Sequence, residues 1–233
     1  MKTRTLLFDA DGTLWDFDAS AVISIRTVFK RRGYIYSDDV FSRYERINKG
    51  LWERYERGEM SRDRVLTERF DLLFAELGIN ADGAAFEDEF REELEQNPVW
   101  MEGAQELLTT LRPDFQMYIV TNGVASTQHK RIALTGLDRY VDGIFISEKI
   151  GAVKPQEAFF DHVFAHIRPC PKNDILLIGD SLPADILGAN RSGIRSCWFN
   201  PARLPLDGEA CPDFEIHALS ELPDIIKEER SWN

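Results

Sequence analysis

The sequence predicts an α/β protein, with a doubly wound, mainly parallel sheet and an inserted all-helical domain. Two observations support this fold class. Short apolar runs, which are typical of buried parallel strands, alternate with amphipathic helical stretches from Pro98 onward, and a similar run occupies residues 6–8. A wholly helical stretch separates these two parts. The chain has 233 residues, 43% of them hydrophobic, which suffices for one domain with an insertion.

The elements of the sheet follow one another in regular alternation. Residues 6–8 form the first expected strand. After Pro98 we expect strands near residues 116–120, 144–146, 174–178 and 195–199, and helices near 102–111, 125–135, 156–167 and 184–192. This alternation implies right-handed crossovers between parallel strands. The polar residues that follow the strands should therefore meet at one edge of the sheet, where open α/β folds bind ligands.

The inserted stretch carries apolar residues at helical spacing throughout. Gly33, Gly58 and Gly78 fall where helices should end. The expected helices cover residues 19–32, 38–57, 61–77 and 83–96. We therefore expect a Rossmann-like core made of residues 1–17 and 98–233, and a helical domain made of residues 18–97.

Net charge, apolar runs and cysteine spacing exclude several classes of protein. A formal charge of −12 argues against binding to nucleic-acid polymers, whose phosphates are normally met by clustered Lys and Arg. No apolar run approaches the roughly 20 residues that cross a membrane, so we expect a cytoplasmic protein with no membrane partner. The three cysteines are widely spaced and form no Cys-x-x-Cys motif, which indicates neither a disulfide framework nor a zinc site.

Two carboxylates stand at the end of the first strand, those of Asp9 and Asp11. Carboxylates this close repel each other unless a cation, a shared proton or hydrogen bonds compensate. Hydrolysis of a phosphate monoester needs a nucleophile, a proton donor and positive charge around the transferring group. Asp9 can act as the nucleophile and form an aspartyl-phosphate. Asp11 can protonate the leaving oxygen and then activate the attacking water.

Later segments supply the remaining groups of such a site. Thr121 and the backbone N–H of Asn122 follow a strand and can bind phosphoryl oxygens, and Lys154 adds a positive charge that stabilises the transition state. Oxygen ligands like the site's carboxylates suit Mg²⁺. We assign catalysis to Asp9, Asp11, Thr121 and Lys154, and binding of the substrate phosphate to Asp9, Gly12, Thr121, Asn122 and Lys154.

With the run Gly179-Asp180-Ser181 and with Asp185, these segments resemble the four motifs of the haloacid dehalogenase superfamily. Most members of that superfamily are magnesium-dependent phosphatases. The resemblance implies that Mg²⁺ is held by the carboxylates of Asp9 and Asp180 and by the backbone carbonyl of Asp11. Asp185 would hold metal-bound water or orient Asp180. The resemblance also implies that the helical insertion is a cap that closes over the active site and selects the leaving group.

Further segments look like the branch of pyrimidine 5′-nucleotidases that includes noncanonical pyrimidine nucleotidases. The likeness implies a pyrimidine nucleoside monophosphate as substrate, such as dUMP, UMP, dTMP or a modified analogue. One departure is Gly12, where some of that branch carry Glu. Trp52 and Tyr55 could stack on a nucleobase, although their spacing favours packing inside the insertion. The segments that carry the likeness are residues 9–11, 15–18, 47–58, 69–70 and 147–155.

Other functions share parts of this pattern. A sugar-phosphate or phosphoglycolate phosphatase, or a phosphomutase, would use the same core motifs. A haloacid dehalogenase would need neither Asp11 nor a metal. A non-catalytic phosphate-binding module would be expected to lose a catalytic residue, whereas all are in place here. The sequence leaves open the physiological substrate, the cap residues that read it, the oligomeric state, and a role in salvage or in removal of damaged nucleotides.

Overall fold

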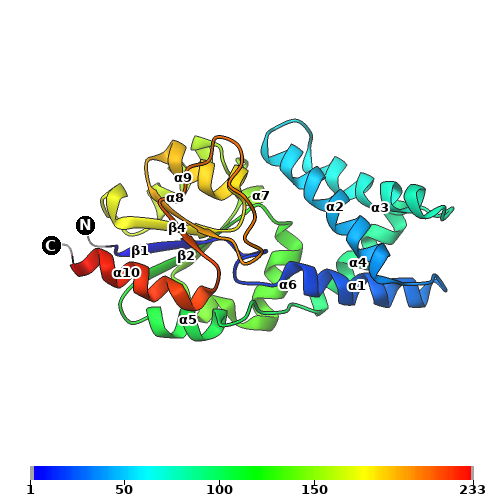
Figure 1. Cartoon of the computed structure of the whole chain (residues 1–233), viewed down its shortest axis with the longest axis horizontal. Helices are drawn as coiled ribbons and strands as arrows, with labels where there is room; N and C mark the ends of the chain where they lie inside the picture. The colour runs from blue at the N-terminus through cyan, green and yellow to red at the C-terminus, as the bar shows by residue number, and fades with distance from the viewer. Residues whose placement is uncertain (1–2, 232–233) are drawn as a thin grey trace. The chain divides into compact units, whose positions relative to one another are not determined.

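A six-stranded parallel sheet forms the centre of the part of the molecule that lies outside the helical insertion (Figure 1). The computed structural model describes residues 3–231. Within that range the strand order is β3-β2-β1-β4-β5-β6, so β1 lies in the middle of the sheet, between β2 and β4. The strands are β1 (Thr5–Phe8), β2 (Gln116–Thr121), β3 (Gly143–Ile146), β4 (Ile175–Gly179), β5 (Arg195–Phe199) and β6 (Phe214–Ile216).

Alternating side chains of the strands build two apolar layers, one on each face of the sheet. Leu6 and Phe8 of β1 belong to the cluster that contains apolar residues of α5 (Ala104–Leu111) and α10 (Leu222–Ser231). Leu7 belongs to the opposite cluster, with residues of α8 (Glu157–His166) and α9 (Leu187–Ser192). Figure 1 shows α5 and α10 on one side of the strands and α8 and α9 on the other. The period of two along a strand gives the sheet two apolar faces, and helices cover both of them. This arrangement confirms the predicted doubly wound fold class.

The chain divides into two compact units, which we call the core unit and the helical unit. The core unit consists of Met1–Asp16 and Trp100–Asn233, and the helical unit is Phe17–Val99. The helical unit contains α1 (Phe17–Arg31), α2 (Asp38–Glu56), α3 (Arg62–Leu77) and α4 (Gly83–Gln96). These four helices enclose an aromatic-rich core of their own. Among the described residues, no helix is long and apolar enough to cross a membrane.

Some elements differ from the sequence prediction. The strand β6 was not expected, because it is only three residues long and its central Glu215 is exposed. The helix expected over residues 184–192 begins instead with a π-helical turn, Leu182–Ile186, which α9 continues. The remaining helices of the core unit are α6 (Ala125–Thr135) and the short α7 (Ser147–Ile150), of which α7 was not predicted.

Candidate active site

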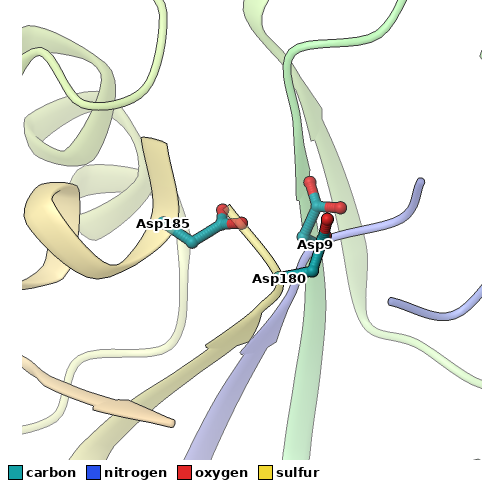
Figure 2. Close-up of side chains that lie close together, drawn as sticks. All are labelled: Asp9, Asp180 and Asp185. Atoms are coloured by element: carbon teal, nitrogen blue, oxygen red, sulfur yellow. The ribbon is translucent and has the colours of Figure 1, made fainter. Parts of the chain in front are cut away.

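Three aspartates converge at the carboxyl edge of the sheet (Figure 2). Asp9 directly follows β1, Asp180 directly follows β4, and Asp185 lies in the π-helical turn after β4. One carboxylate oxygen of each lies within 4.8 Å of the others. Because β1 and β4 are parallel neighbours, with Phe8 opposite Ile178, the two chains deliver their carboxylates to the same place.

Two glycines make this crowding sterically possible. A Cβ atom at Gly12 would lie 2.5 Å from Oδ2 of Asp180, and the backbone of Gly12 has a φ of +88°. A Cβ atom at Gly179 would lie 2.3 Å from Cγ of Asp185. Any larger residue at either position would therefore displace one of the three carboxylates.

Lys154 neutralises part of the charge of this cluster. Its side chain is almost fully buried, and its Nζ donates to Oδ1 of Asp9 and to Oδ1 of Asp185, each at 2.6 Å. The third hydrogen bond from Nζ goes to the Val120 carbonyl, at 2.8 Å. All three ammonium protons are thus committed, which fixes the charge beside Asp9.

The amide of Asn122 holds the backbone of Lys154 from two sides. Its Nδ2 donates to the Lys154 carbonyl and its Oδ1 accepts from the Lys154 N–H, both at 3.0 Å. The Lys154–Pro155 peptide bond that follows is cis. The sequence prediction used only the backbone N–H of Asn122, so this side-chain role is an additional finding.

Burial and mutual repulsion shift the protonation of these groups. Burial raises the pKa of Asp9 well above its usual range, Lys154 opposes that shift, and the charges of Asp185 and Asp180 add to it. Burial, followed by the charge of Asp185, raises the pKa of Asp180 to about 7. Burial alone would lower the pKa of Lys154, but the Asp185 and Asp9 carboxylates outweigh it and raise that pKa.

The donor set fits a hard divalent cation. Asp9, Asp180 and Asp185 supply three carboxylates against the single positive charge of Lys154. The pKa values of Asp9 and Asp180 are raised first by burial and further by the neighbouring carboxylates. Oxygen ligands in a crowded anionic cluster are the environment that Mg²⁺ prefers.

The carboxylate of Asp11 is held apart from this cluster by helix α6. Its Oδ2 accepts a hydrogen bond of 2.5 Å from Nε2 of Gln128, and its Oδ1 accepts from Nη1 of Arg131. Sequence reasoning missed both partners, because on α6 they resemble ordinary polar residues of an amphipathic helix. The ligand roles predicted for Asp9, Asp11, Asp180 and Asp185 stay predictions.

The predicted phosphate-binding residues have distinct surroundings. Oγ1 of Thr121 accepts from the Gly123 N–H at 3.0 Å and from Nε2 of Gln128 at 3.2 Å, so its own proton remains available to a phosphoryl oxygen. The N–H of Gly12 donates to the Trp15 carbonyl at 2.8 Å. In this structure Gly12 leaves space for the Asp180 carboxylate. Binding of the substrate phosphate by Gly12 stays a prediction.

Two further contacts support Asp180. Its Oδ1 accepts from Oγ1 of Thr13 at 3.0 Å, and its backbone carbonyl accepts from Nε1 of Trp198 at 2.9 Å. Thr13 belongs to the same turn as Asp9 and Asp11. This short segment therefore supplies two carboxylates of the site and a hydrogen-bond donor to Asp180. The threonine in the run after Asp11 was a signal that could have indicated this support.

Known proteins resemble this chain in both sequence and fold. HAD-hydrolase YfnB of Bacillus subtilis (strain 168) is 41% identical over 230 residues, which are 99% of this chain and 98% of that protein. A magnesium-bound crystal structure of YfnB matches with a TM-score of 0.92 and covers 97% of this chain and 99% of that chain. Pyrimidine 5′-nucleotidase PynA of Streptococcus pneumoniae (strain ATCC BAA-255 / R6) is 34% identical, over 97% of this chain and 96% of PynA.

Pyrimidine 5′-nucleotidase YjjG of Escherichia coli (strain K12) is 28% identical, over 97% of this chain and 99% of that protein. The family model of the haloacid dehalogenase-like hydrolases matches residues 6–199. That range begins in β1 and ends with β5, so it includes every predicted site residue. The chain therefore belongs to the haloacid dehalogenase-like hydrolases.

Proposed function

We propose that this hydrolase is a Mg²⁺-dependent phosphatase that cleaves pyrimidine nucleoside 5′-monophosphates through an aspartyl-phosphate on Asp9. The observation that carries the phosphatase chemistry is the contact of Asp9 with Lys154, inside a cluster of three carboxylates. This arrangement combines a nucleophile, a fixed positive charge and ligands for a divalent cation. The preference for pyrimidine nucleotides is supported by the relatives PynA and YjjG.

The first half of the reaction transfers the phosphoryl group to the enzyme. A carboxylate oxygen of Asp9 forms a bond to phosphorus while the bond from phosphorus to the leaving oxygen breaks. Protonated Asp11 gives its proton to that oxygen, so the nucleoside leaves as a neutral alcohol. General acid catalysis of this kind contributes typically ~100- to 10,000-fold.

The second half returns the enzyme to its starting state. Asp11, now ionised, takes a proton from water as the water oxygen bonds to phosphorus. The bond between phosphorus and Asp9 breaks, which releases phosphate and restores the Asp9 carboxylate. The same residue thus serves first as acid and then as base.

The remaining site residues bind the phosphate and the metal. The hydroxyl of Thr121 and the backbone N–H of Asn122 donate to phosphoryl oxygens, and Lys154 attracts the phosphoryl group through its positive charge. The carboxylates of Asp9 and Asp180 and the backbone carbonyl of Asp11 would hold Mg²⁺, supported by Asp185. Bound Mg²⁺ would supply positive charge that stabilises the phosphoryl oxygens in the transition state.

We assign selection of the leaving group to the helical unit. Trp52 and Tyr55 of α2 contact each other edge to face, with ring centroids 5.5 Å apart, and pack against the apolar core of their own unit. This packing favours the structural role for both rings over stacking on a base. The residues that read the pyrimidine are therefore to be sought elsewhere on that unit.

Phosphate release from a panel of esters tests this function. The panel contains pyrimidine and purine nucleoside monophosphates, sugar phosphates and phosphoglycolate, each measured with Mg²⁺ and with EDTA. We expect metal-dependent release that is fastest with the pyrimidine nucleotides. Faster release from sugar phosphates would keep the catalytic chemistry and reject the substrate class, and no release from any ester would reject both.

A further inference from the structure

Both oxygens of the Asp11 carboxylate are occupied by side chains of one helix. Gln128 and Arg131 are three residues apart on α6, so they share a face of that helix and reach Asp11 together. The Asp11 side chain is 26% exposed, whereas that of Arg131 is 1% exposed. A partly exposed carboxylate is thus fixed by two partners that are themselves immobilised by burial.

The burial of Arg131 is costly unless Asp11 compensates for it. An isolated charge inside a protein carries a desolvation penalty of several kcal/mol. Among the described residues, Nε and Nη2 of Arg131 and Oε1 of Gln128 have no hydrogen-bond partner. The other contact that stabilises the guanidinium is the face of Trp15, 4.3 Å from the ring centroid. A residue buried for packing alone would be apolar here, so the contact with Asp11 explains the presence of Arg131.

Gly123 allows Gln128 to approach Asp11. A Cβ atom at position 123 would lie 2.0 Å from Nε2 of Gln128 and 3.2 Å from Oδ2 of Asp11. The same Nε2 also donates to Oγ1 of Thr121 at 3.2 Å. Gln128 thereby ties together a residue assigned to proton transfer and one assigned to phosphate binding.

We propose that Arg131 and Gln128 are positioning residues that hold the Asp11 carboxylate in place for proton transfer to the leaving oxygen. The proposal rests on the proposed phosphatase function. Without these partners the carboxylate of Asp11 would be free to rotate away from the leaving oxygen. A carboxylate has about four lone-pair sites, so the two hydrogen bonds leave room for the transferred proton.

Leaving-group dependence is the readout that separates positioning from simple structural support. A nucleoside leaves as an alkoxide that needs a proton, whereas the phenolate of p-nitrophenyl phosphate leaves without one. For Arg131→Met and for Gln128→Leu we expect kcat/KM to fall about 10-fold or more with UMP and less than about 3-fold with p-nitrophenyl phosphate. Arg131→Lys, which keeps the charge, should recover part of the loss with UMP.

The matched control is Lys130→Met, which removes the same charge from an exposed position of α6. It should leave both kcat/KM values unchanged. In an Asp11→Asn background, adding Arg131→Met should cause little further loss with UMP, because the group being positioned is already inactive. Thermal unfolding of each variant shows whether it folds. If Arg131→Met does not fold, Gln128→Leu, which removes no charge, tests the proposal in its place.

The outcomes distinguish failure of the positioning role from failure of the proposed phosphatase function. Equal losses with UMP and p-nitrophenyl phosphate, or additive losses in the Asp11→Asn background, would overturn the positioning role while the phosphatase function stands. If wild-type enzyme does not hydrolyse UMP, the nucleotide that it does hydrolyse, or another alkyl phosphate from the panel, takes its place in the ratio. Absence of all phosphatase activity in the wild type would overturn the proposed function, and this inference with it.

Discussion

At the scale of single residues, three aspartates of the site form ion pairs with two buried cations, and the two cations have separate partners. Lys154 contacts Asp9 and Asp185, while Arg131 contacts Asp11. One cation therefore lies with the groups assigned to phosphorus and the metal, and the other lies with the group assigned to proton transfer. This division gives two neighbouring carboxylates of one turn different surroundings, which is how enzymes obtain different roles from like residues.

Protons should compete with the metal at Asp180. The pKa of this group is raised to about 7 in the metal-free protein, first by burial and then by Asp185. Below that pH Asp180 is largely protonated and must lose its proton to bind Mg²⁺. We expect the Kd for Mg²⁺ to rise up to about tenfold for each pH unit below 7 and to level off above pH 8. Calorimetric titration with Mg²⁺ from pH 5.5 to 8.5 measures this, and a Kd independent of pH would contradict it.

The same shift has a consequence for stability. Because the folded pKa of Asp180 is raised above its unfolded value, the folded protein holds the extra proton between about pH 4 and pH 7. The metal-free protein should therefore lose stability as the pH rises through that window. Added Mg²⁺ should restore it above pH 7.

Gly12 should be needed both for its backbone and for the space it leaves. For Gly12→Ala we expect about 1–2 kcal/mol of lost stability from the positive φ, together with loss of activity, because the Cβ would displace Asp180. Gly193→Ala is the control, since Gly193 also has a positive φ, of +69°, and no atom lies near its Cβ position. Thermal unfolding and phosphate release are measured for both. Retained activity in Gly12→Ala would show that the close approach to Asp180 is dispensable.

At the scale of elements, the ends of three strands could be predicted from the sequence, whereas side-chain contacts between separate elements could not. The apolar runs and the polar residues that follow them located β1, β2 and β4, and hence Asp9, Thr121 and Asp180. The partners of Asp11 escaped notice because Gln128 and Arg131 face it only once α6 has packed against the sheet. Their spacing along the helix gives no sign of which strand end lies opposite. The amide of Asn122 was overlooked for a similar reason, since its partner is 32 residues away.

A buried ion pair links two helices of the helical unit. Arg69 of α3 donates to both oxygens of Glu87 on α4, each at 2.6 Å, and both residues are at most 5% exposed. For Glu87→Gln we expect a loss of about 3–5 kcal/mol in the free energy of unfolding, because the Arg69 charge stays buried without its partner. Denaturant unfolding measures this loss.

An exposed pair on the same unit provides the matched control. Glu68 accepts from Arg64 at 2.6 Å on the surface of α3, and Glu68→Gln should cost less than about 1 kcal/mol. Replacing both buried partners, as in Arg69→Met with Glu87→Leu, should recover most of the stability lost by Glu87→Gln. Equal losses for Glu87→Gln and Glu68→Gln would mean that the buried pair is not a determinant of stability.

At the scale of the whole molecule, each unit has apolar clusters of its own. One cluster lies entirely within residues 17–99, and the others lie entirely in the core unit. The two connections between the units leave the core side by side, because Trp15 pairs with Trp100 and the Met101 N–H donates to the Leu14 carbonyl at 2.9 Å. The core unit can therefore be closed by a short turn in place of the insertion.

Removing the helical unit should separate chemistry from selectivity. With residues 17–99 replaced by a short Gly/Ser turn, we expect a folded core that binds Mg²⁺ and still hydrolyses p-nitrophenyl phosphate. Its preference for pyrimidine over purine monophosphates should disappear, because the roles proposed for core residues concern the phosphate, the metal and the leaving oxygen and not the base. Circular dichroism and the ratio of kcat/KM values check both parts. An unchanged preference would place selectivity in the core unit.

The central claim is that Asp9 carries the phosphoryl group during turnover, and peptide mass spectrometry tests it most directly. Asp11→Asn enzyme would be mixed with Mg²⁺ and p-nitrophenyl phosphate, whose leaving group needs no proton, quenched in acid within one turnover, and digested. Loss of the general base should slow hydrolysis of the intermediate, so we predict a phosphoryl group on the peptide that contains Asp9 and none in the Asp9→Asn, Asp11→Asn double variant. A phosphoryl group on a different residue, or turnover that persists in Asp9→Asn, would contradict the account.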